Sequence, residues 1–307
     1  MKTKPSRVEL RIPASTSNLG PGFDAVGLAV SLYSEFLFER VDSGLEILIE
    51  GEGSDVLPRG PVYRPYQAFQ KACKVLGKEV TGLRVVQHNA VPFARGLGGS
   101  GIAALAGTMA AFLLCGTDPD MGRVLDLSFA METHPDNVTP SLVGGLTVSV
   151  IEDNHVVYVK LIPSSKLTTV ILIPDRPLDT VLARKIVPQQ FSREDMIFNI
   201  RAAAMTMAAL ATDQLEHLAL AMRDRLHQPY RAPLLVGMMD IFKAALEAGS
   251  PGVALSGAGS GIFAFAYPHN EQAIGEAMKA AATRFGMNAY YLCLPIDHVG
   301  AQILKVS

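Results

Sequence analysis

The segment VPFARGLGGSGIAALAG (residues 91–107) contains five glycines and one serine, and it leads into an apolar stretch typical of a buried helix. Glycine lets the backbone approach a ligand closely and adopt positive φ angles. The start of a helix presents unpaired N–H groups and a partial positive charge, which together attract phosphate. The segment therefore predicts an anion-binding loop, and a glycine-rich turn needed only for packing is the alternative.

Two familiar nucleotide-binding loops have a similar glycine spacing, but their context is absent. Residues 96–101 match G-x-G-x-x-G and Asp118 follows at a suitable distance, yet Asp118 lies in a turn between two predicted helices instead of at the end of a strand. A Walker loop needs a lysine, and none occurs between Lys78 and Lys160. The third option is a kinase loop that neutralises phosphate with amides, the helix dipole and Mg²⁺.

Such a kinase loop needs a carboxylate for the metal, because Mg²⁺ prefers hard oxygen ligands and keeps several waters. Glu132, at the end of the next predicted helix, is the candidate. Taken by itself, Glu132 fits a solvated charge at a helix end equally well.

The composition points to a reduced, globular protein. The chain has 307 residues, of which 49% are hydrophobic and 18% charged, which favours two domains. A net charge of -2 gives no electrostatic footprint for nucleic acid or an anionic membrane. No secretory signal is evident, and three cysteines without CxxC spacing indicate free thiols and a cytoplasmic location. The uncharged run at 96–117 approaches transmembrane length, but its GLGGSG start favours a buried helix.

Alternating, β-branched and aromatic stretches predict strands, and apolar residues three or four apart predict helices. Strands are expected at residues 8–15, 32–41, 45–53, 81–91, 144–153, 155–163, 167–175 and 288–296, with two more within 252–267. Helices are expected at residues 66–76, 100–115, 121–131, 195–211, 213–223, 234–248 and 271–285. This order predicts an α+β protein with two domains that divide near residues 155–167.

Three separated segments carry a resemblance to a known family. They are PASTSNLGPGFDAVGLA (13–29), PFARGLGGS (92–100) and LSGAGSGIFA (255–264), and they resemble the three ordered motifs of the GHMP kinase superfamily. Within that superfamily, ETHPDNVTP (132–140) and HQPYR (227–231) are similar to segments of the homoserine kinases, as are NLGPGFD (18–24) and ARKIVP (183–188). The similarity runs over essentially the whole chain.

The resemblance implies a two-domain α+β GHMP kinase fold. An ATP-binding domain like ribosomal protein S5 domain 2 would span residues 1–160, and a ferredoxin-like domain would span residues 161–307. The implied reaction is MgATP-dependent phosphorylation of the L-homoserine hydroxyl in threonine biosynthesis, carried out in the cytoplasm by a homodimer. Another GHMP kinase acting on a carboxylate-bearing alcohol, or a ligand-sensing protein without turnover, are the alternatives.

The resemblance also assigns the nucleotide site. The loop would hold the ATP phosphates mainly through backbone amides, with the cofactor-binding residues Pro92, Arg95, Gly96, Leu97, Gly98, Gly99, Ser100, Gly101 and Ile102. Ser100 and Glu132 would bind Mg²⁺. Two departures from the family pattern stand out: Gly99 replaces a serine, and the third loop has Ser260-Gly261 where a Pro-Thr pair is usual.

Homoserine is a zwitterion, so its site needs a cation for the carboxylate and acceptors for the ammonium group. Arg184 and Arg231 would bind the carboxylate, since a guanidinium group can do so with two parallel hydrogen bonds. Asn18 would help to bind the substrate. His134 and His227 fall in matched segments and are expected to be hydrogen-bonded structural histidines.

The resemblance names Asn137, Asp136 and Asp24 as catalytic residues, with Asn137 and Asp24 also contacting the substrate. They would orient the ammonium group and the attacking hydroxyl. The first motif has no lysine, so we expect Asn137 to orient the hydroxyl and not to accept its proton. The local alternatives are a turn around Gly-Pro-Gly for Asp24 and a helix N-cap for Asp136 and Asn137.

Overall fold

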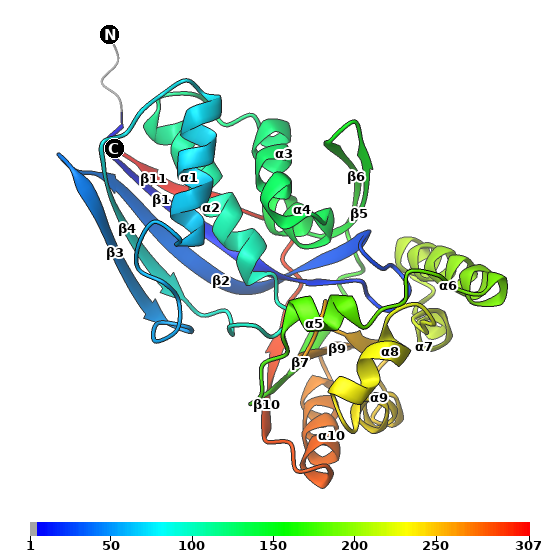
Figure 1. Ribbon diagram of the computed structural model, residues 1–307. Coiled ribbons are helices and arrows are strands. Elements are labelled where there is room, and N and C mark those ends of the chain that lie inside the picture. Colours follow the sequence, from blue (N-terminus) through cyan, green and yellow to red (C-terminus); the bar gives the residue numbers. More distant parts are fainter. Residues whose placement is uncertain (1–4) are drawn as a thin grey trace.

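The first half of the chain and one strand from its end form a seven-stranded sheet. Figure 1 shows the computed structural model, which describes residues 5–307. The strands of this sheet are β1 (Arg7–Ser17), β2 (Val26–Arg40), β3 (Gly44–Gly51), β4 (Gly82–Asn89), β5 (Leu146–Glu152), β6 (His155–Leu161) and β11 (Gln302–Val306). The main path runs β11-β1-β2-β4-β3, and β5 pairs with β2 and β6. Only β3 and β4 run parallel, and the connection between them carries a helix, as a parallel pair requires.

Strand β1 is covered on one face in its first part and buried on both faces in its second part, which leads into the site. Its first residues alternate between buried and partly buried, as expected of a strand with one covered face. From Ile12 to Ser17 every residue is buried, and the last three, Ser15, Thr16 and Ser17, are polar. Buried hydroxyls need hydrogen-bond partners, and these come from segments far away in the sequence.

Four helices cover one face of this sheet (Figure 1). They are α1 (Arg64–Val75), α2 (Gly99–Leu114), α3 (Met121–Glu132) and α4 (Pro135–Val143). Helix α2 is buried along nearly all of its length and packs against α1. A Cβ atom on Gly107 would lie 2.0 Å from the Pro65 carbonyl oxygen, so only glycine permits this approach of the two helices.

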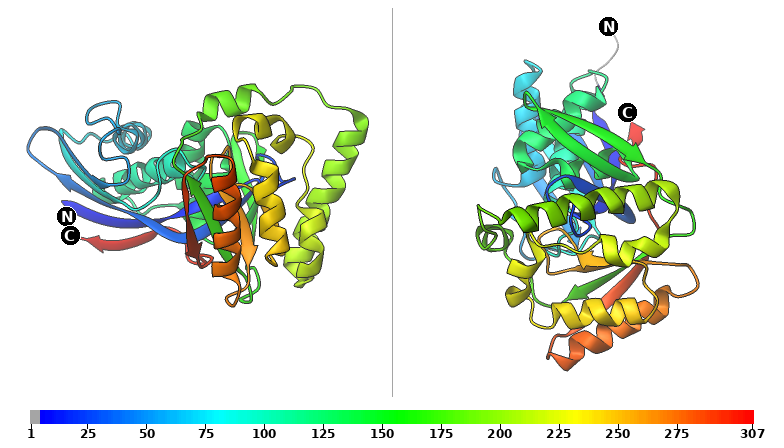
Figure 2. Two further views of the ribbon diagram at one scale, coloured as in Figure 1. Left: turned by 90° about the horizontal axis from the view of Figure 1, so that it is seen from below. Right: turned by 90° about the vertical axis from the view of Figure 1, so that its right-hand side faces the viewer.

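The second half contains a four-stranded antiparallel sheet in the order β10-β7-β9-β8. Its strands are β7 (Thr168–Pro174), β8 (Val253–Leu255), β9 (Ile262–Ala266) and β10 (Ala289–Leu294). Its helices are α5 (Thr180–Lys185), α6 (Arg193–Thr212), α7 (Leu218–Ala221), α8 (Gln228–Arg231), α9 (Met238–Glu247) and α10 (Glu271–Arg284), with 3-10 turns at Leu215–His217 and Ala232–Leu234. Helices α9 and α10 pack beside each other in both views of Figure 2.

Two predicted helices are shorter than expected. The helix predicted at 213–223 is a 3-10 turn followed by the single turn α7, because Asp213 takes a left-handed conformation and ends α6. The helix predicted at 234–248 begins only at Met238, after Gly237 at φ 87°. The hairpin of β5 and β6 and the buried helix after the glycine loop are confirmed.

The last strand returns to the first sheet. β11 pairs antiparallel with β1, and Figure 2 shows the two strands side by side. The division at residues 160/161 stays a prediction, to which the structure adds that residues 302–306 complete the sheet of the first half.

Within residues 5–307, no helix is both long and apolar enough to cross a membrane. Cys73 and Cys115 lie 42 positions apart, and their Sγ atoms form a hydrogen bond of 3.8 Å and no disulfide. The predicted free thiols are thus confirmed.

The contact at Gly107 gives a stability prediction. Gly107→Ala improves helix propensity by at most about 1 kcal/mol, but its methyl group meets backbone that cannot move aside. We expect a net loss of about 2 kcal/mol or more in the free energy of unfolding, measured by urea denaturation. Gly99→Ala, on the same helix and with open space at its Cβ, is the control and should not destabilise the fold. Equal stability of both variants would contradict this account.

Candidate functional site

The three motifs converge on one cavity of about 420 Å³ between the two halves of the protein. Its walls include the glycine loop, the end of β1, the start of α1 and the loop after β8. Of the residues predicted from sequence, it is lined by Asn18, Pro92, Arg95, Gly96, Leu97, Gly98, Gly99, Ser100, Gly101, Glu132, Asp136, Asn137, Arg184 and Arg231.

The glycine loop ends in an uncapped helix. Gly98 is the N-cap residue of α2 at φ 72°, and no side chain accepts a hydrogen bond from the first turn. The amides of the first helical residues therefore face the cavity end of α2 without an intrahelical partner. Ile102 lies behind this turn: its side chain is buried and its amide donates to the Gly98 carbonyl at 3.0 Å.

The third motif holds the glycine loop in place. Ser256 Oγ donates to the Gly96 carbonyl at 2.8 Å, and the Gly261 amide donates to the Arg95 carbonyl at 3.2 Å. A Cβ atom on Gly96 would lie 1.9 Å from the Ser256 carbonyl oxygen, so the two loops meet backbone to backbone. The Arg95 guanidinium is also occupied, since it donates to the carbonyls of Pro174 and Asp175 at 2.7 and 2.8 Å. Its side chain thus ties the loop to the second half of the protein.

Ser100 and Glu132 meet as the sequence predicted. Ser100 Oγ donates to Glu132 Oε1 at 2.7 Å, which places one hydroxyl and one carboxylate at the mouth of α2. Arg64, at the start of α1, also bonds Oε1, with Nε at 3.1 Å and Nη2 at 2.5 Å. Sequence reasoning missed Arg64, because it lies 68 positions from Glu132 in a segment without a motif.

The donors here suit a hard cation that brings its own ligands. Among residues 5–307, no cluster of three or more His, Cys, Asp or Glu side chains could enclose a metal. One carboxylate and one hydroxyl match Mg²⁺, which is commonly bound by one or two carboxylates together with substrate phosphates and water. The site therefore fits Mg²⁺ that arrives with a nucleotide.

Asn137 joins α4 to the end of β1. Its Oδ1 accepts from Ser15 Oγ at 3.1 Å, and its Nδ2 donates to Ser17 Oγ at 3.0 Å. It lies within the first turn of α4, whose N-cap residue is His134, so the alternative reading of Asn137 as an N-cap is wrong.

Asp136 is the most strongly perturbed carboxyl group in the cavity wall. Its side chain is 2% exposed, and burial, followed by repulsion from Asp24, raises its pKa to about 6. A hydrogen bond from the Ser17 hydroxyl and electrostatic attraction from His134 and Arg184 oppose this shift in pKa. Asn137 Nδ2 also donates to Asp136 Oδ1, at 3.3 Å. Asp136 is also not an N-cap.

The loop after β1 places Asp24 beside Arg184 and His134. Asn18 and Asp24 adopt positive φ angles of 71° and 57°, and Asn18 Oδ1 accepts from the Asp24 amide at 3.0 Å. Asp24 then forms two bonds with Arg184, at 3.2 and 3.3 Å. Burial raises the pKa of Asp24, but hydrogen bonds from His134 and Arg184 outweigh it, so the pKa lies below its usual value.

His134 completes this group. Its Nε2 lies 2.7 Å from Arg184 Nη1 and 3.1 Å from Asp24 Oδ2, so it can serve only one of them at a time. Its Nδ1 is 2.7 Å from Thr133 Oγ1. The predicted hydrogen-bonded role of His134 is confirmed, but its position among predicted substrate residues was not foreseen.

Arg231 is the most deeply buried cation of the site, with 1% of its surface exposed. Burial, and then repulsion from Arg184, lowers its pKa to about 10, so it stays charged at neutral pH. Both predicted carboxylate-binding arginines thus line one cavity, although they come from separate helices, α5 and α8.

Comparison with known proteins identifies the family. The model of the GHMP kinases N terminal domain matches residues 62–145, and that of the GHMP kinases C terminal domain matches residues 206–283. Homoserine kinase of Moorella thermoacetica is 38% identical over 91% of this chain and 93% of its own length. Homoserine kinase of Microchaete diplosiphon is 37% identical over 98% of both chains. The chain belongs to the homoserine kinase family of the GHMP kinases.

A crystal structure of homoserine kinase from Cytophaga hutchinsonii has a TM-score of 0.89 with 26% identity over 99% of both chains. Mevalonate kinase of L. major shares the fold at a TM-score of 0.70 and 16% identity. The two-domain α+β GHMP kinase fold expected from the sequence is therefore confirmed. In this homoserine kinase family member, a Cβ atom added to Gly99 would have no neighbouring atom within 4 Å. Packing therefore does not require glycine at this position.

The raised pKa of Asp136 gives a pH-dependent prediction. In the folded protein Asp136 binds its proton up to about pH 6, but in the unfolded chain only up to its ordinary value of 3.8. The fold therefore gains stability from this group as the pH falls from 7 to 4 and loses it as the pH rises through 6. Asp136→Asn removes this pH dependence. The change that it causes in the free energy of unfolding should be more favourable at pH 7 than at pH 4, by up to about 3 kcal/mol.

Urea denaturation of both proteins between pH 4 and pH 7.5 measures this difference. A difference in unfolding free energy that stays constant across the range would show that Asp136 has an ordinary pKa in the fold.

Proposed function

We propose that this protein phosphorylates the side-chain hydroxyl of L-homoserine with ATP, forming O-phospho-L-homoserine for threonine biosynthesis. Membership of the GHMP kinases makes it an ATP-dependent kinase that acts on a hydroxyl group. The observation that carries the substrate proposal is the pair formed by Arg184, which lines the cavity, and Asp24, which is bonded to it.

This pair matches an amino-acid zwitterion. Asp24 and Arg184 bond each other at 3.2 and 3.3 Å, distances longer than those typical of charge-assisted hydrogen bonds. Their side chains are 27% and 36% exposed, and Arg184 lines the cavity, so neither charge is sealed off from a ligand. An ammonium group and a carboxylate on one small molecule can replace these partners, with Arg231 as a second cation for the carboxylate. Sugar or isoprenoid alcohols carry no such charge pair.

The nucleotide would occupy the other end of the cavity. The unpaired amides at the start of α2 would bind the triphosphate, and Ser100 and Glu132 would hold Mg²⁺. When bound, Mg²⁺ offsets the negative charge of the phosphates. The chain's own contribution is to fix the loop through Ser256 and to place the hydroxyl of the substrate beside Asn137.

Asn137 suits an orienting role. Both ends of its amide are held by the Ser15 and Ser17 hydroxyls, which restricts its rotation. A loose transition state for phosphoryl transfer requires little deprotonation of the attacking hydroxyl, so positioning is the main demand on the protein.

An assay of ADP formation with MgATP tests the function. L-Homoserine should give turnover, whereas threonine, shikimate, mevalonate and galactose should not. Two truncated analogues sharpen the test: 3-aminopropan-1-ol lacks the carboxylate and 4-hydroxybutyrate lacks the ammonium group. Both should be poor substrates. ATP binding without turnover of any alcohol would instead favour a ligand-sensing protein.

Glu132→Gln tests the metal assignment. The neutral amide removes the carboxylate that Ser100 contacts at the mouth of α2, so we expect kcat to fall by about 100-fold or more, as for loss of a major electrostatic group. Circular dichroism and the thermal unfolding midpoint should show an intact fold. Glu79→Gln, an exposed loop residue, is the matched control. Unchanged Mg²⁺-dependent turnover in Glu132→Gln would remove Glu132 from the metal site.

Arg184→Lys tests the carboxylate site. Lysine keeps the charge but cannot bind a carboxylate with two parallel bonds, so KM for L-homoserine should rise by about tenfold or more. KM for ATP should not change, because Arg184 lies at the Asp24 end of the cavity. Arg284→Lys, exposed at the end of α10, serves as the control. A rise in KM for ATP alone would place Arg184 in the nucleotide site.

We also infer a homodimer in the cytoplasm. Light scattering of the purified protein measures its molar mass and so tests the homodimer.

A further inference from the structure

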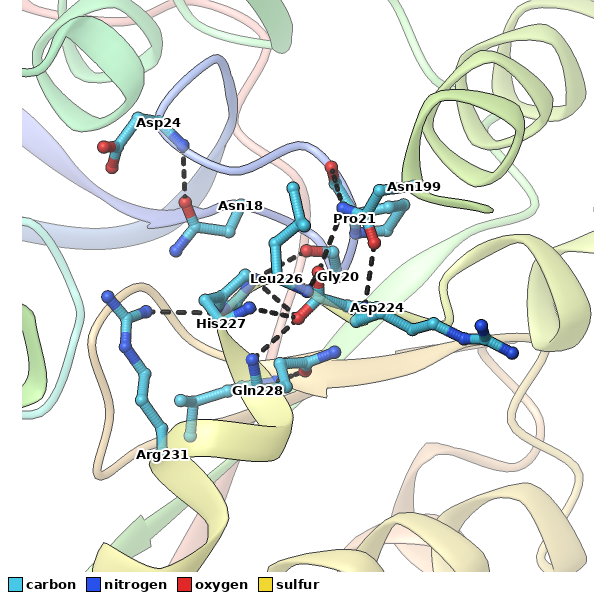
Figure 3. Close-up of polar contacts among 12 residues, drawn as sticks. Asn18, Gly20, Pro21, Asp24, Asn199, Asp224, Leu226, His227, Gln228 and Arg231 are labelled. Carbon is cyan, nitrogen blue, oxygen red and sulfur yellow. Dashed lines mark hydrogen bonds and ion pairs between the residues drawn. The ribbon is translucent and has the colours of Figure 1, made fainter. Parts of the chain in front are cut away.

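The His227 side chain connects the first motif to Arg231 (Figure 3). It is 0% exposed, and its Nε2 lies 2.7 Å from the Gly20 carbonyl oxygen. Its Nδ1 lies 3.1 Å from Arg231 Nη1. Phe23 stacks on its ring at 5.0 Å and also lies 5.3 Å from the Arg231 guanidinium.

These partners fix the protonation state of the ring. A carbonyl oxygen can only accept, so Nε2 must carry a hydrogen. A guanidinium can only donate, so Nδ1 must be bare. His227 is therefore neutral, with its proton on Nε2. Burial lowers the pKa of His227, which agrees with a neutral ring.

Asp224 holds the backbone next to this histidine, and its Oδ2 also lies 3.5 Å from the ring Nε2, the nitrogen that carries the hydrogen. Its side chain is 0% exposed and accepts from the backbone amides of His227 at 2.9 Å and Gln228 at 2.6 Å. The other oxygen accepts from Asn199 Nδ2 at 3.0 Å. Asn199 Nδ2 also donates to the Pro21 carbonyl at 3.2 Å. Two consecutive carbonyls of the first-motif loop, those of Gly20 and Pro21, are thus held by one buried group of side chains.

Arg231 is the end point of this network. Its Nε donates to the Ala183 carbonyl at 2.9 Å, and its Nη1 donates to His227 and, at 3.1 Å, to the Gly257 carbonyl. Asn18 Nδ2 donates to the same Gly257 carbonyl at 3.0 Å. Within residues 5–307, Nη2 has no acceptor, and Arg231 lines the cavity. The bonds to Nε and Nη1 fix the plane of the guanidinium and leave Nη2 for a ligand.

We propose that His227 is a positioning residue for substrate binding: its bare Nδ1 orients the Arg231 guanidinium toward the substrate carboxylate, while its Nε2–H holds the Gly20 loop. This rests on the proposed function, because it takes Arg231 as a carboxylate ligand. It gives a role in the reaction to a histidine that does not itself contact the substrate.

Two substitutions separate the two bonds of the ring. Asparagine can place an oxygen where Nδ1 lies, so His227→Asn keeps an acceptor for Arg231 and loses the donor to Gly20. Glutamine can place an amide nitrogen where Nε2 lies, so His227→Gln keeps the donor and loses the acceptor. His88→Gln, which alters an exposed residue on β4, is the control.

We expect His227→Gln to raise KM for L-homoserine by about 10- to 100-fold, as for a lost hydrogen bond to a charged group, with KM for ATP unchanged. His227→Asn should change this KM much less and lower the unfolding midpoint. The reverse pattern, or no effect of either variant on KM for L-homoserine, would overturn the proposal. If another carboxylate-bearing alcohol is the substrate, the comparison applies to its KM.

Nuclear magnetic resonance of ¹⁵N-labelled histidine tests the network without any substrate or turnover. The His227 signal is identified as the one that disappears in His227→Gln. It should be that of a neutral ring with its hydrogen on Nε2, and it should not titrate between about pH 5.5 and 8. A charged ring or the Nδ1–H form would overturn the proposal even if homoserine is the substrate. Absence of homoserine turnover together with the expected ring form would instead refute only the proposed function.

Discussion

The start of α2 is the constraint on which the site depends. This long buried helix begins at Gly99, after the N-cap residue Gly98, without a capping side chain, so its first amides need an external acceptor. Replacing Gly98 or Gly96 would bring a Cβ within 2.3 Å of a neighbouring oxygen, so the loop keeps one shape. That shape is held from both halves of the protein, by Ser256 in the second and by the Ser15 amide, which donates to the Leu97 carbonyl at 3.3 Å, in the first. The proposed phosphate recognition would thus depend on backbone geometry and would not need a lysine in the loop.

Two charged groups of the site are paired before any ligand arrives. Glu132 is paired with Arg64, and Asp24 with Arg184. Burying an unpaired charge is costly, so these pairs make an open, charged cavity compatible with a stable fold. Each pair also mimics a ligand: the first holds a carboxylate ready for a cation, and the second imitates the two ends of a zwitterion. If Mg²⁺ and the substrate bind as proposed, they would replace these partners without adding an unpaired buried charge.

Much of the site could be predicted from the sequence, because the glycine loop and the acidic residue after it are local patterns. The resemblance to the GHMP kinases then predicts that Ser100 and Glu132 lie together, and their side chains meet at 2.7 Å. Arg64 could not be predicted, since its role depends on how α1 packs against α2, which Gly107 decides through its contact with Pro65. The bonds between Asp24 and Arg184, 160 positions apart, were likewise invisible, although both residues were predicted separately. In the fold, the error at 213–223 arose because apolar spacing cannot show that Asp213 turns left-handed and ends the helix.

The pairing of β11 with β1 bears on how this protein can be dissected. The Ser307 carbonyl accepts from the amides of Ser6 and Arg7 at 2.7 and 2.9 Å, so hydrogen bonds hold the two ends of the described chain side by side. A fragment that stops near residue 160 would leave the edge of β1 bare, and bare edges invite self-association. The same adjacency makes the molecule suited to circular permutation, with a short linker joining the present ends and new ends opened in an exposed turn such as that at Asp153 and Asn154.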